Sequence, residues 1–208
     1  MILLASVCLA VLLGSIPTGL WMGRLKGVDI RQHGSGNVGA TNVYRVVGKL
    51  PGVLVLAVDV AKGWAPVAVI SPKAVAWGAG ISPEAMEILL AMAAVFGHIW
   101  NPWLQFRGGR GVATGLGALL GLDPRVGWGA AGVWTATAWF SRYVSVSSIA
   151  AAFSAPFLMV ILGLPNLWVV GTVAVSLAII ARHRPNILRL LHGEEPRIGS
   201  ASPEGSPK

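Results

Sequence analysis

Long uncharged stretches of hydrophobic residues make up most of the chain, and short polar stretches separate them. A helix needs about 20 predominantly apolar residues to cross a bilayer. The apolar stretches are 1–23, 50–70, 88–106, 111–122, 126–141 and the two halves of 143–181, which are divided at 163–166. This pattern predicts an all-α, polytopic integral membrane protein with seven transmembrane helices.

Length alone leaves open whether the short stretch 111–122 crosses the membrane or re-enters on one side. If it crosses, thirteen lysines and arginines fall in the loops of one side and two in those of the other; if not, the division is eight against seven. Cytoplasmic loops collect Lys and Arg, so the uneven division predicts seven crossings with the N-terminus outside and the C-terminus cytoplasmic. Gly115, Gly117 and Gly121 would let neighbouring helices shield this short helix.

The composition agrees with a membrane protein. Hydrophobic residues make up 54% of the chain and charged residues 12%, with a mean hydropathy of +0.69, whereas soluble domains carry about 25% charged residues. We expect one domain over 1–199 and a disordered tail over 200–208, which is rich in Ser, Pro and Gly. The single cysteine, Cys8, excludes an internal disulfide.

The net charge of +8 raises nucleic acid as a partner. Because the charge is confined to short loops of a hydrophobic chain, membrane orientation explains it better, and we expect no nucleic-acid partner. The predicted cytoplasmic loops hold few carboxylates and no paired-aspartate motif. We therefore expect neither a metal nor a cofactor, which argues against a magnesium-dependent lipid phosphotransferase.

The stretch 34–45, GSGNVGATNVYR, is rich in glycine and in hydrogen-bond donors and contains no carboxylate. Such a run cannot pack a core, and its backbone amides can surround an anion. It therefore predicts a phosphate site, against the alternative of a plain interhelical loop. The candidate residues are Gly34, Ser35, Gly36, Asn37, Gly39, Thr41, Asn42 and Arg45.

Gly34, Gly36 and Gly39 also match the dinucleotide-binding fingerprint. That fingerprint has meaning only between a strand and a helix of a βαβ unit. Here a predicted transmembrane helix precedes the glycines, so the match does not indicate a nucleotide site.

In a second polar stretch, FRGGRGVAT, two arginines flank a pair of glycines directly before the short helix predicted at 111–122. Arginine binds phosphate through two parallel hydrogen bonds, and a helix N-terminus favours anions. The alternative is a loop that only orients the protein in the membrane, which would need arginine but not glycine. The second set of candidate anion ligands is Arg107, Gly108, Gly109, Arg110 and Gly111.

Asp59 and Lys62 share one face of the second predicted span. Charges at that depth face the bundle interior and are candidates for function. A structural ion pair is an equally good interpretation.

Two more clusters lie at predicted cytoplasmic ends of helices. Ser148 belongs to a serine cluster at the start of the sixth span, where serines either bind a ligand or cap the helix, and capping is the commoner role. His183, Asn186 and Glu195 lie in the third polar stretch, HRPNILRLLHGEE. A histidine there either complements the helix dipole or belongs to a polar site.

Taken together, these stretches resemble the bacterial acyl-phosphate:glycerol-3-phosphate acyltransferases of the inner membrane. The resemblance rests on GSGNVGATNVYR, DVAKG, GHIWNPWLQFRGGRGVAT, RYVSVSS and HRPNILRLLHGEE, which occur in the family's order and spacing over about two-thirds of the chain. Many members have lysine at the positions of Arg107 and Arg110, so substrate affinity does not carry over.

The resemblance implies transfer of a fatty acyl group from acyl phosphate to the sn-1 hydroxyl of glycerol 3-phosphate, giving lysophosphatidic acid and inorganic phosphate. It implies essential roles for Ser35 and Arg45, for the glycines of the second stretch, and for His183, Asn186 and Glu195, with Ser148 near the substrate. It also implies an active site at the cytoplasmic face of the inner membrane. The expected partners are the membrane lipid around the protein and, through a functional link, an enzyme that makes acyl phosphate.

Two phosphorylated substrates need the donors and cations that the three loops supply. Our hypothesis is that Arg45 and Arg107 bind glycerol 3-phosphate, while Ser35 and the amides of 34–41 bind acyl phosphate. His183 and Asn186 would orient the attacking hydroxyl, and either His183 or a substrate phosphate would take its proton. The competing hypothesis is a transporter of a phosphorylated solute, which the charges at Asp59 and Lys62 would suit.

Overall fold

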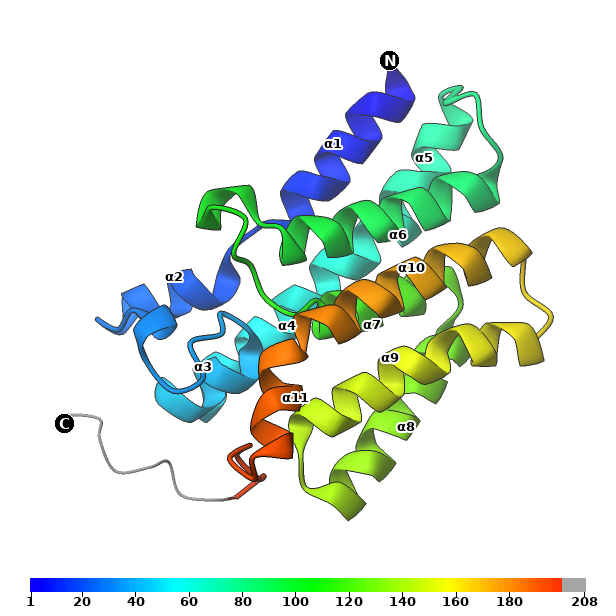
Figure 1. Ribbon diagram of the computed structural model, residues 1–208. Helices are drawn as coiled ribbons and strands as arrows, with labels where there is room; N and C mark the ends of the chain where they lie inside the picture. The colour runs from blue at the N-terminus through cyan, green and yellow to red at the C-terminus, as the bar shows by residue number, and fades with distance from the viewer. Residues whose placement is uncertain (200–208) are drawn as a thin grey trace.

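The computed structural model describes residues 1–199, and the described residues form helices and no strand (Figure 1). This confirms the predicted all-α class; the expected disordered tail, 200–208, lies outside the described residues. The helices are α1 (Ile2–Gly14), α2 (Thr18–Leu25), α3 (Ala40–Val46), α4 (Lys49–Ala65), α5 (Ser71–Ala76), α6 (Pro83–Ile99), α7 (Val112–Leu122), α8 (Pro124–Ser141), α9 (Val144–Ile161), α10 (Asn166–Arg182) and α11 (Arg184–Leu191).

The predicted bounds of the later helices agree with the structure, whereas those of the second and third differ. A π-helical segment, Pro66–Ile70, joins α4 to α5, so the second span continues six residues beyond the predicted end at 70. The third span begins earlier than predicted, because the Ser82 hydroxyl accepts a hydrogen bond from the Ala85 amide and Pro83 takes the first helical position. It also ends earlier, at Ile99, just before Asn101 and Pro102.

The first predicted span is broken between α1 and α2, at Ser15–Pro17. Proline cannot donate the backbone hydrogen bond that a continuous helix needs. The carbonyls freed by the break accept side-chain donors: Lys62 Nζ lies 3.0 Å from the Ile16 oxygen and Asn101 Nδ2 lies 2.6 Å from the Ser15 oxygen. Such partners are what a broken helix requires inside a bilayer.

Asp59 and Lys62 form a buried ion pair of 2.8 Å, and each side chain is less than 5% exposed. Because Lys62 also binds the break after α1, the pair has a structural role. Asp59 also lines the cavity between α6, α7, α8, α9 and α10.

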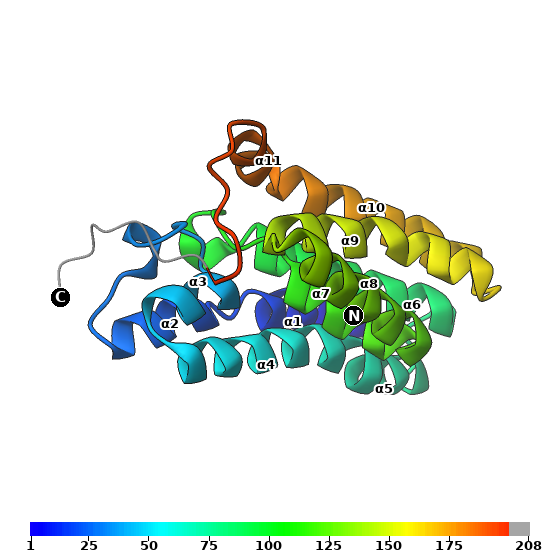
Figure 2. The ribbon, with the colours of Figure 1, turned by 90° about the horizontal axis from the view of Figure 1, so that it is seen from below.

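The short helix α7 lies at the centre of the bundle, in contact with α4, α6 and α8. In Figure 2, α4 and α5 run along one side and α10 and α11 along the other, with α6 and α7 between them. A Cβ atom at Gly117 would collide with the Val60 carbonyl of α4, and one at Gly63 would collide with the Thr114 carbonyl of α7. Glycine at both positions therefore permits the predicted close shielding of the short helix.

Three helical segments are long and apolar enough to cross a membrane among residues 1–199: Ile2–Leu25, Lys49–Ala76 and Val144–Ile161. A fourth results if α10 and α11, which are bent by 51° at their junction, form one span. The number of seven crossings therefore stays a prediction.

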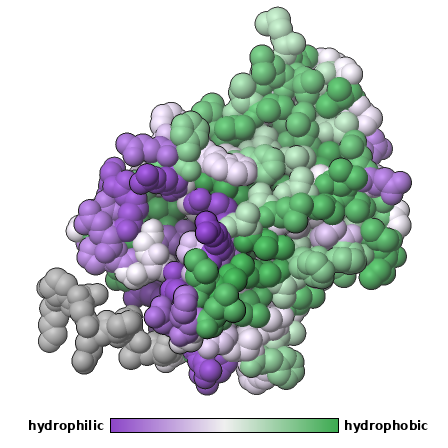
Figure 3. Space-filling model, viewed as in Figure 1, coloured by the Kyte–Doolittle hydropathy of each residue, from purple (hydrophilic) through white to green (hydrophobic). Residues whose placement is uncertain are grey.

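Hydrophilic residues gather over α2, α3 and α11, whereas hydrophobic residues cover most of the remaining surface in the view of Figure 3. We call the region of α2, α3, α11 and the loop 105–111 the polar end of the bundle. All three polar stretches of the sequence lie there, although they are far apart along the chain (Figure 1).

Candidate active site

A cavity of about 280 Å³ lies between α6, α7, α8, α9 and α10. Most of its wall is apolar. The exceptions at the polar end come from six different parts of the chain, and they include Asn37, Thr41, Asp59, His98, Arg110, Ser148 and His183. The cavity therefore joins a cationic, donor-rich end to a long hydrophobic interior.

The loop before α3 is held in shape by the side chain of Asn42, which is buried. Its Oδ1 accepts a hydrogen bond from the Ser35 amide at 2.9 Å, and its Nδ2 donates to the carbonyls of Ile30, His33 and Asn37. These contacts occupy both ends of the amide group, so Asn42 organises the loop rather than binding a ligand directly. They also occupy the Ser35 amide, one of those predicted to bind an anion.

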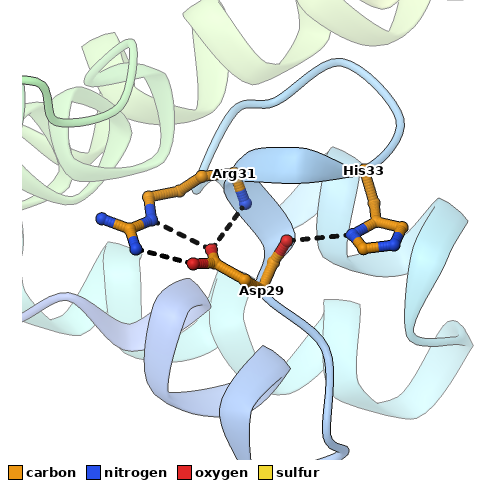
Figure 4. A network of polar contacts seen from close by, with 3 residues as sticks. All are labelled: Asp29, Arg31 and His33. Carbon is orange, nitrogen blue, oxygen red and sulfur yellow. Dashed lines mark hydrogen bonds and ion pairs between the residues drawn. The ribbon is translucent and has the colours of Figure 1, made fainter.

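The carboxylate closest in sequence to this loop, Asp29, is held by Arg31 (Figure 4). Hydrogen bonds from the Arg31 side chain and amide lower the pKa of Asp29 to about 2. The His33 Nδ1 atom lies 3.0 Å from the Asp29 carbonyl. Because Arg31 neutralises Asp29, this carboxylate competes little with an anion that binds beyond the loop.

The glycines of the second polar stretch are required by packing. Gly108 and Gly109 donate their amides to the carbonyls of Ile99 and His98, at 3.1 and 3.2 Å. A Cβ atom at Gly109 would collide with the ring of His98. Both amides are therefore already paired with the end of α6, and a role for Gly108 and Gly109 at an anion site stays a prediction.

Replacing Gly109 by alanine is expected to destabilise the fold by about 1–3 kcal/mol, because the added methyl overpacks the ring of His98. Gly132 of α8 is the matched control, since a Cβ there meets nothing within 4 Å. The Gly132→Ala variant should be neutral or more stable by up to about 1 kcal/mol. Thermal unfolding of the two purified variants measures the difference; equal melting temperatures would show that the ring moves aside without cost.

The two arginines of this stretch differ in their surroundings. Arg110 is half-buried and lines the cavity, whereas Arg107 is exposed and does not line it. Burial lowers the pKa of Arg110 to about 10, which leaves the guanidinium charged at neutral pH. Arg110 makes no ion pair with any of residues 1–199, so its charge is available to an anion in the cavity.

His183 follows α10 and is 1% exposed. Its Nδ1 atom lies 2.8 Å from the Ile179 carbonyl, which can only accept a hydrogen bond. The proton therefore sits on Nδ1, and Nε2 keeps a lone pair. Because His183 lines the cavity, this lone pair is the atom of the histidine that can accept a proton from a ligand bound there.

The last described segment returns to α11 and brings Glu195 to the polar end. Asn186 Nδ2 donates to Glu195 Oε1 at 2.7 Å, and Arg189 Nε lies 2.8 Å from Oε2. Burial acts to raise the pKa of Glu195, but interactions with the Ser145 hydroxyl and hydrogen bonds from Asn186 and Arg189 outweigh it and lower the pKa. Asn186 thus contacts Glu195, and it does not line the cavity.

Ser148 lines the cavity but does not cap its helix. Its hydroxyl donates to the Val144 carbonyl at 2.8 Å and lies 3.2 Å from Trp134 Nε1. The Tyr143 position that begins α9 has no side-chain cap. Helix capping, the commoner interpretation of this serine from the sequence, is therefore wrong.

The structure brings Asn37, Gly39, Thr41, Arg110, Gly111, Ser148 and His183 to one cavity, together with Asp59. Ser35, Arg45 and Arg107 do not line it, and neither does Glu195. Arg45 on α3 is still close enough to Glu195 and Arg189 for their charges to interact. These four residues, Ser35, Arg45, Arg107 and Glu195, lie at the polar end of the bundle but do not line the cavity.

His98 and Asn101 are not among the candidate residues predicted from the sequence. His98 lines the cavity and supports Gly109, and Asn101 and Trp103 bind Ser15 at the break after α1. Polar residues inside a predicted span, here 88–106, were the signal for both.

Comparison with known proteins identifies the family. The family model for glycerol-3-phosphate acyltransferase matches residues 4–193. A glycerol-3-phosphate acyltransferase of Synechococcus sp. (strain JA-3-3Ab) is 49% identical over 90% of this chain and 89% of its own. Glycerol-3-phosphate acyltransferase 2 of Moorella thermoacetica is 47% identical over 96% of this chain and 99% of its own.

Two solved structures of PlsY (YgiH), an integral membrane glycerol 3-phosphate acyltransferase, have the same fold. The glycerol 3-phosphate form is 40% identical, with a TM-score of 0.87 over 95% of this chain and 96% of that one. The lysophosphatidic acid form is 39% identical, with a TM-score of 0.85 over 96% and 97%. With the family model and the close relatives in agreement over most of its length, this chain belongs to the glycerol-3-phosphate acyltransferase family of integral membrane enzymes.

Proposed function

We propose that this enzyme transfers a fatty acyl group from acyl phosphate to the sn-1 hydroxyl of glycerol 3-phosphate. The products are lysophosphatidic acid and inorganic phosphate. One observation carries the proposal: Arg110, a half-buried cation without an ion-pair partner among residues 1–199, and His183 lie at the polar end of a long apolar cavity. The cation can bind a phosphate group, and the apolar wall can bury an acyl chain.

The solved relatives support the proposed acceptor substrate and the proposed product. The two forms of PlsY are described with glycerol 3-phosphate and with lysophosphatidic acid, which are the proposed acceptor and product. Membership of an enzyme family also sets aside the transporter hypothesis.

In the proposed reaction the sn-1 oxygen attacks the carbonyl carbon of acyl phosphate, and the bond from that carbon to the phosphate oxygen breaks. The His183 Nε2 lone pair accepts the hydroxyl proton. Phosphate is a good leaving group, so much of the catalysis is positioning of the hydroxyl against the carbonyl. Asn186 acts through Glu195, which it contacts, as a positioning residue.

The anion sites follow from charge and position. Arg110 binds phosphate at the cavity, and Arg45 extends the positive region at its edge. Asn37 and Thr41, which line the same end of the cavity, contribute donors, and Ser35 belongs to the loop that Asn42 holds. The exposed Arg107 is assigned a peripheral role.

We further propose that residues 1–199 form a single domain with seven crossings, the N-terminus outside and the polar end in the cytoplasm. The uneven charge division supports this orientation, and so does the gathering of hydrophilic residues over α2, α3 and α11. The enzyme would then act in the bacterial inner membrane, within reach of an enzyme that supplies acyl phosphate. The acyl chain occupies the apolar part of the cavity.

Phosphate release by the purified enzyme in lipid tests the reaction. We expect release only when acyl phosphate and glycerol 3-phosphate are both present, with lysophosphatidic acid formed in equal amount. Equal rates with acyl-CoA in place of acyl phosphate would disprove the donor assignment while leaving the family assignment intact.

A further inference from the structure

The cavity has a definite length. It is lined on α7 and the residue before it by 111–122, on α9 by residues within 144–155, and on α10 and the residue after it by residues within 172–183. Each range advances eleven residues, which at about 1.5 Å per residue is about 16 Å. Three independent helices therefore give the same depth.

Beyond the apolar end, the same helix faces carry large buried side chains. Met159 follows the last lining residue of α9, Ala155, by four residues; Trp168 precedes Thr172 on α10 by four. Residues four apart lie on one face of a helix. Val126 precedes Ala130 of α8 in the same way.

These three side chains belong to one packed cluster, and none of them lines the cavity. Met159 and Val126 are fully buried, and Trp168 is 9% exposed. The hydroxyl of Thr172 lies 3.3 Å from the Met159 sulfur, and Trp168 Nε1 donates to the Glu84 carbonyl at 3.1 Å. Contacts with Thr172 and with the Glu84 carbonyl thus fix the positions of Met159 and Trp168.

We propose that Met159, Trp168 and Val126 form a floor that sets the longest acyl chain the enzyme accepts. This inference rests on the proposed function, because it assigns the apolar part of the cavity to the acyl tail. A tail that reaches the floor must bend or leave the cavity when it is lengthened further, and it then loses the contacts that favour its burial.

The depth gives an estimate of that chain. Three backbone bonds of an extended peptide span about 3.5 Å, hence about 1.2 Å per bond. A cavity of about 16 Å then holds about 13 bonds, hence an extended tail of about 14 carbons. Longer donors should lose efficiency by about tenfold for two added carbons, because each methylene that stays unburied costs part of the binding.

The test compares kcat/KM for a series of saturated acyl phosphates of about 12 to 20 carbons, which bracket the estimated length. Met159→Ala, which shortens the floor side chain, should raise the efficiency of donors longer than the wild-type optimum by about tenfold relative to the optimum. Met159→Val should shift the profile in the same direction by less, and it serves if the alanine variant unfolds. Ala155→Leu, which fills the end of the cavity, should shift the optimum to shorter chains.

Ile161→Ala is the matched control, because Ile161 lies on the same helix and is 79% exposed. Its length profile should equal that of the wild type. A wild-type profile without a cut-off, or one that none of the three cavity variants shifts, would show that the tail leaves the cavity sideways into the bilayer, and it would overturn the floor.

Binding of alkyl phosphates separates this inference from the proposed reaction. These ligands carry the tail and the phosphate but cannot transfer an acyl group. A binding cut-off that Met159→Ala moves to longer chains, in an enzyme that releases no phosphate from acyl phosphate, would support the floor and disprove the donor. Turnover with acyl phosphate, but without a chain-length cut-off in either measurement, would support the proposed donor and overturn the floor.

Discussion

Replacing His183 by alanine is expected to lower kcat by about 10²- to 10⁴-fold, the usual contribution of a positioned general base. In the structure Nδ1 donates to the Ile179 carbonyl, so Nε2 keeps a lone pair that can accept a proton. The effect should fall on kcat more than on the KM for glycerol 3-phosphate, since the base acts on the hydroxyl in the transition state. Steady-state phosphate release at varied glycerol 3-phosphate measures both.

His192→Ala is the matched control, since His192 is exposed and follows α11 by one residue. It should keep the wild-type kcat. Since His183 is buried, the melting temperature of His183→Ala must be measured alongside. A folded His183→Ala enzyme with near-normal kcat would show that His183 is not the base. A substrate phosphate would then be the group that takes the proton.

The sequence predicts the helices well where the information is local. Uninterrupted apolar runs and the 163–166 break give α8, α9 and α10 close to their observed bounds. The break after α1 was missed although Pro17 lies inside the predicted span. What keeps the break stable comes from Lys62 and Asn101, far along the chain, and no local pattern reveals such partners.

The site was predictable in its residue types but less so in their individual roles. The donor-rich loops do meet at one end of the bundle, as the charge pattern suggested. The sequence does not show which donors already form hydrogen bonds within the protein. The Asn42 side chain bonds to its own loop, and the amides of Gly108 and Gly109 donate to carbonyls at the end of α6. Only packing distinguishes a polar group that is already satisfied from one that is left for a ligand.

The exposed and half-buried arginines of the second polar stretch illustrate the same difference. Arg107 and Arg110 are equivalent in the sequence, two cations that flank a pair of glycines. In the structure only Arg110 lines the cavity. An ionic hydrogen bond to phosphate is stronger in such a partly desolvated position than at the surface.

Replacing Arg110 by glutamine should therefore lower kcat/KM by about 10- to 10²-fold, because a hydrogen bond to a charged group contributes about 1.5–3 kcal/mol. Arg110→Lys should recover part of the loss, since it restores the charge but not the two parallel donors. Arg107→Gln is the matched control and should change kcat/KM by less than about threefold, as exposed ion pairs contribute little. Phosphate release measured for all three variants at varied acyl phosphate, and again at varied glycerol 3-phosphate, also identifies which substrate Arg110 binds. A larger loss for Arg107→Gln than for Arg110→Gln would mean that the phosphate binds outside the cavity, and the assignment of the cavity's polar end to the reacting groups would then fail.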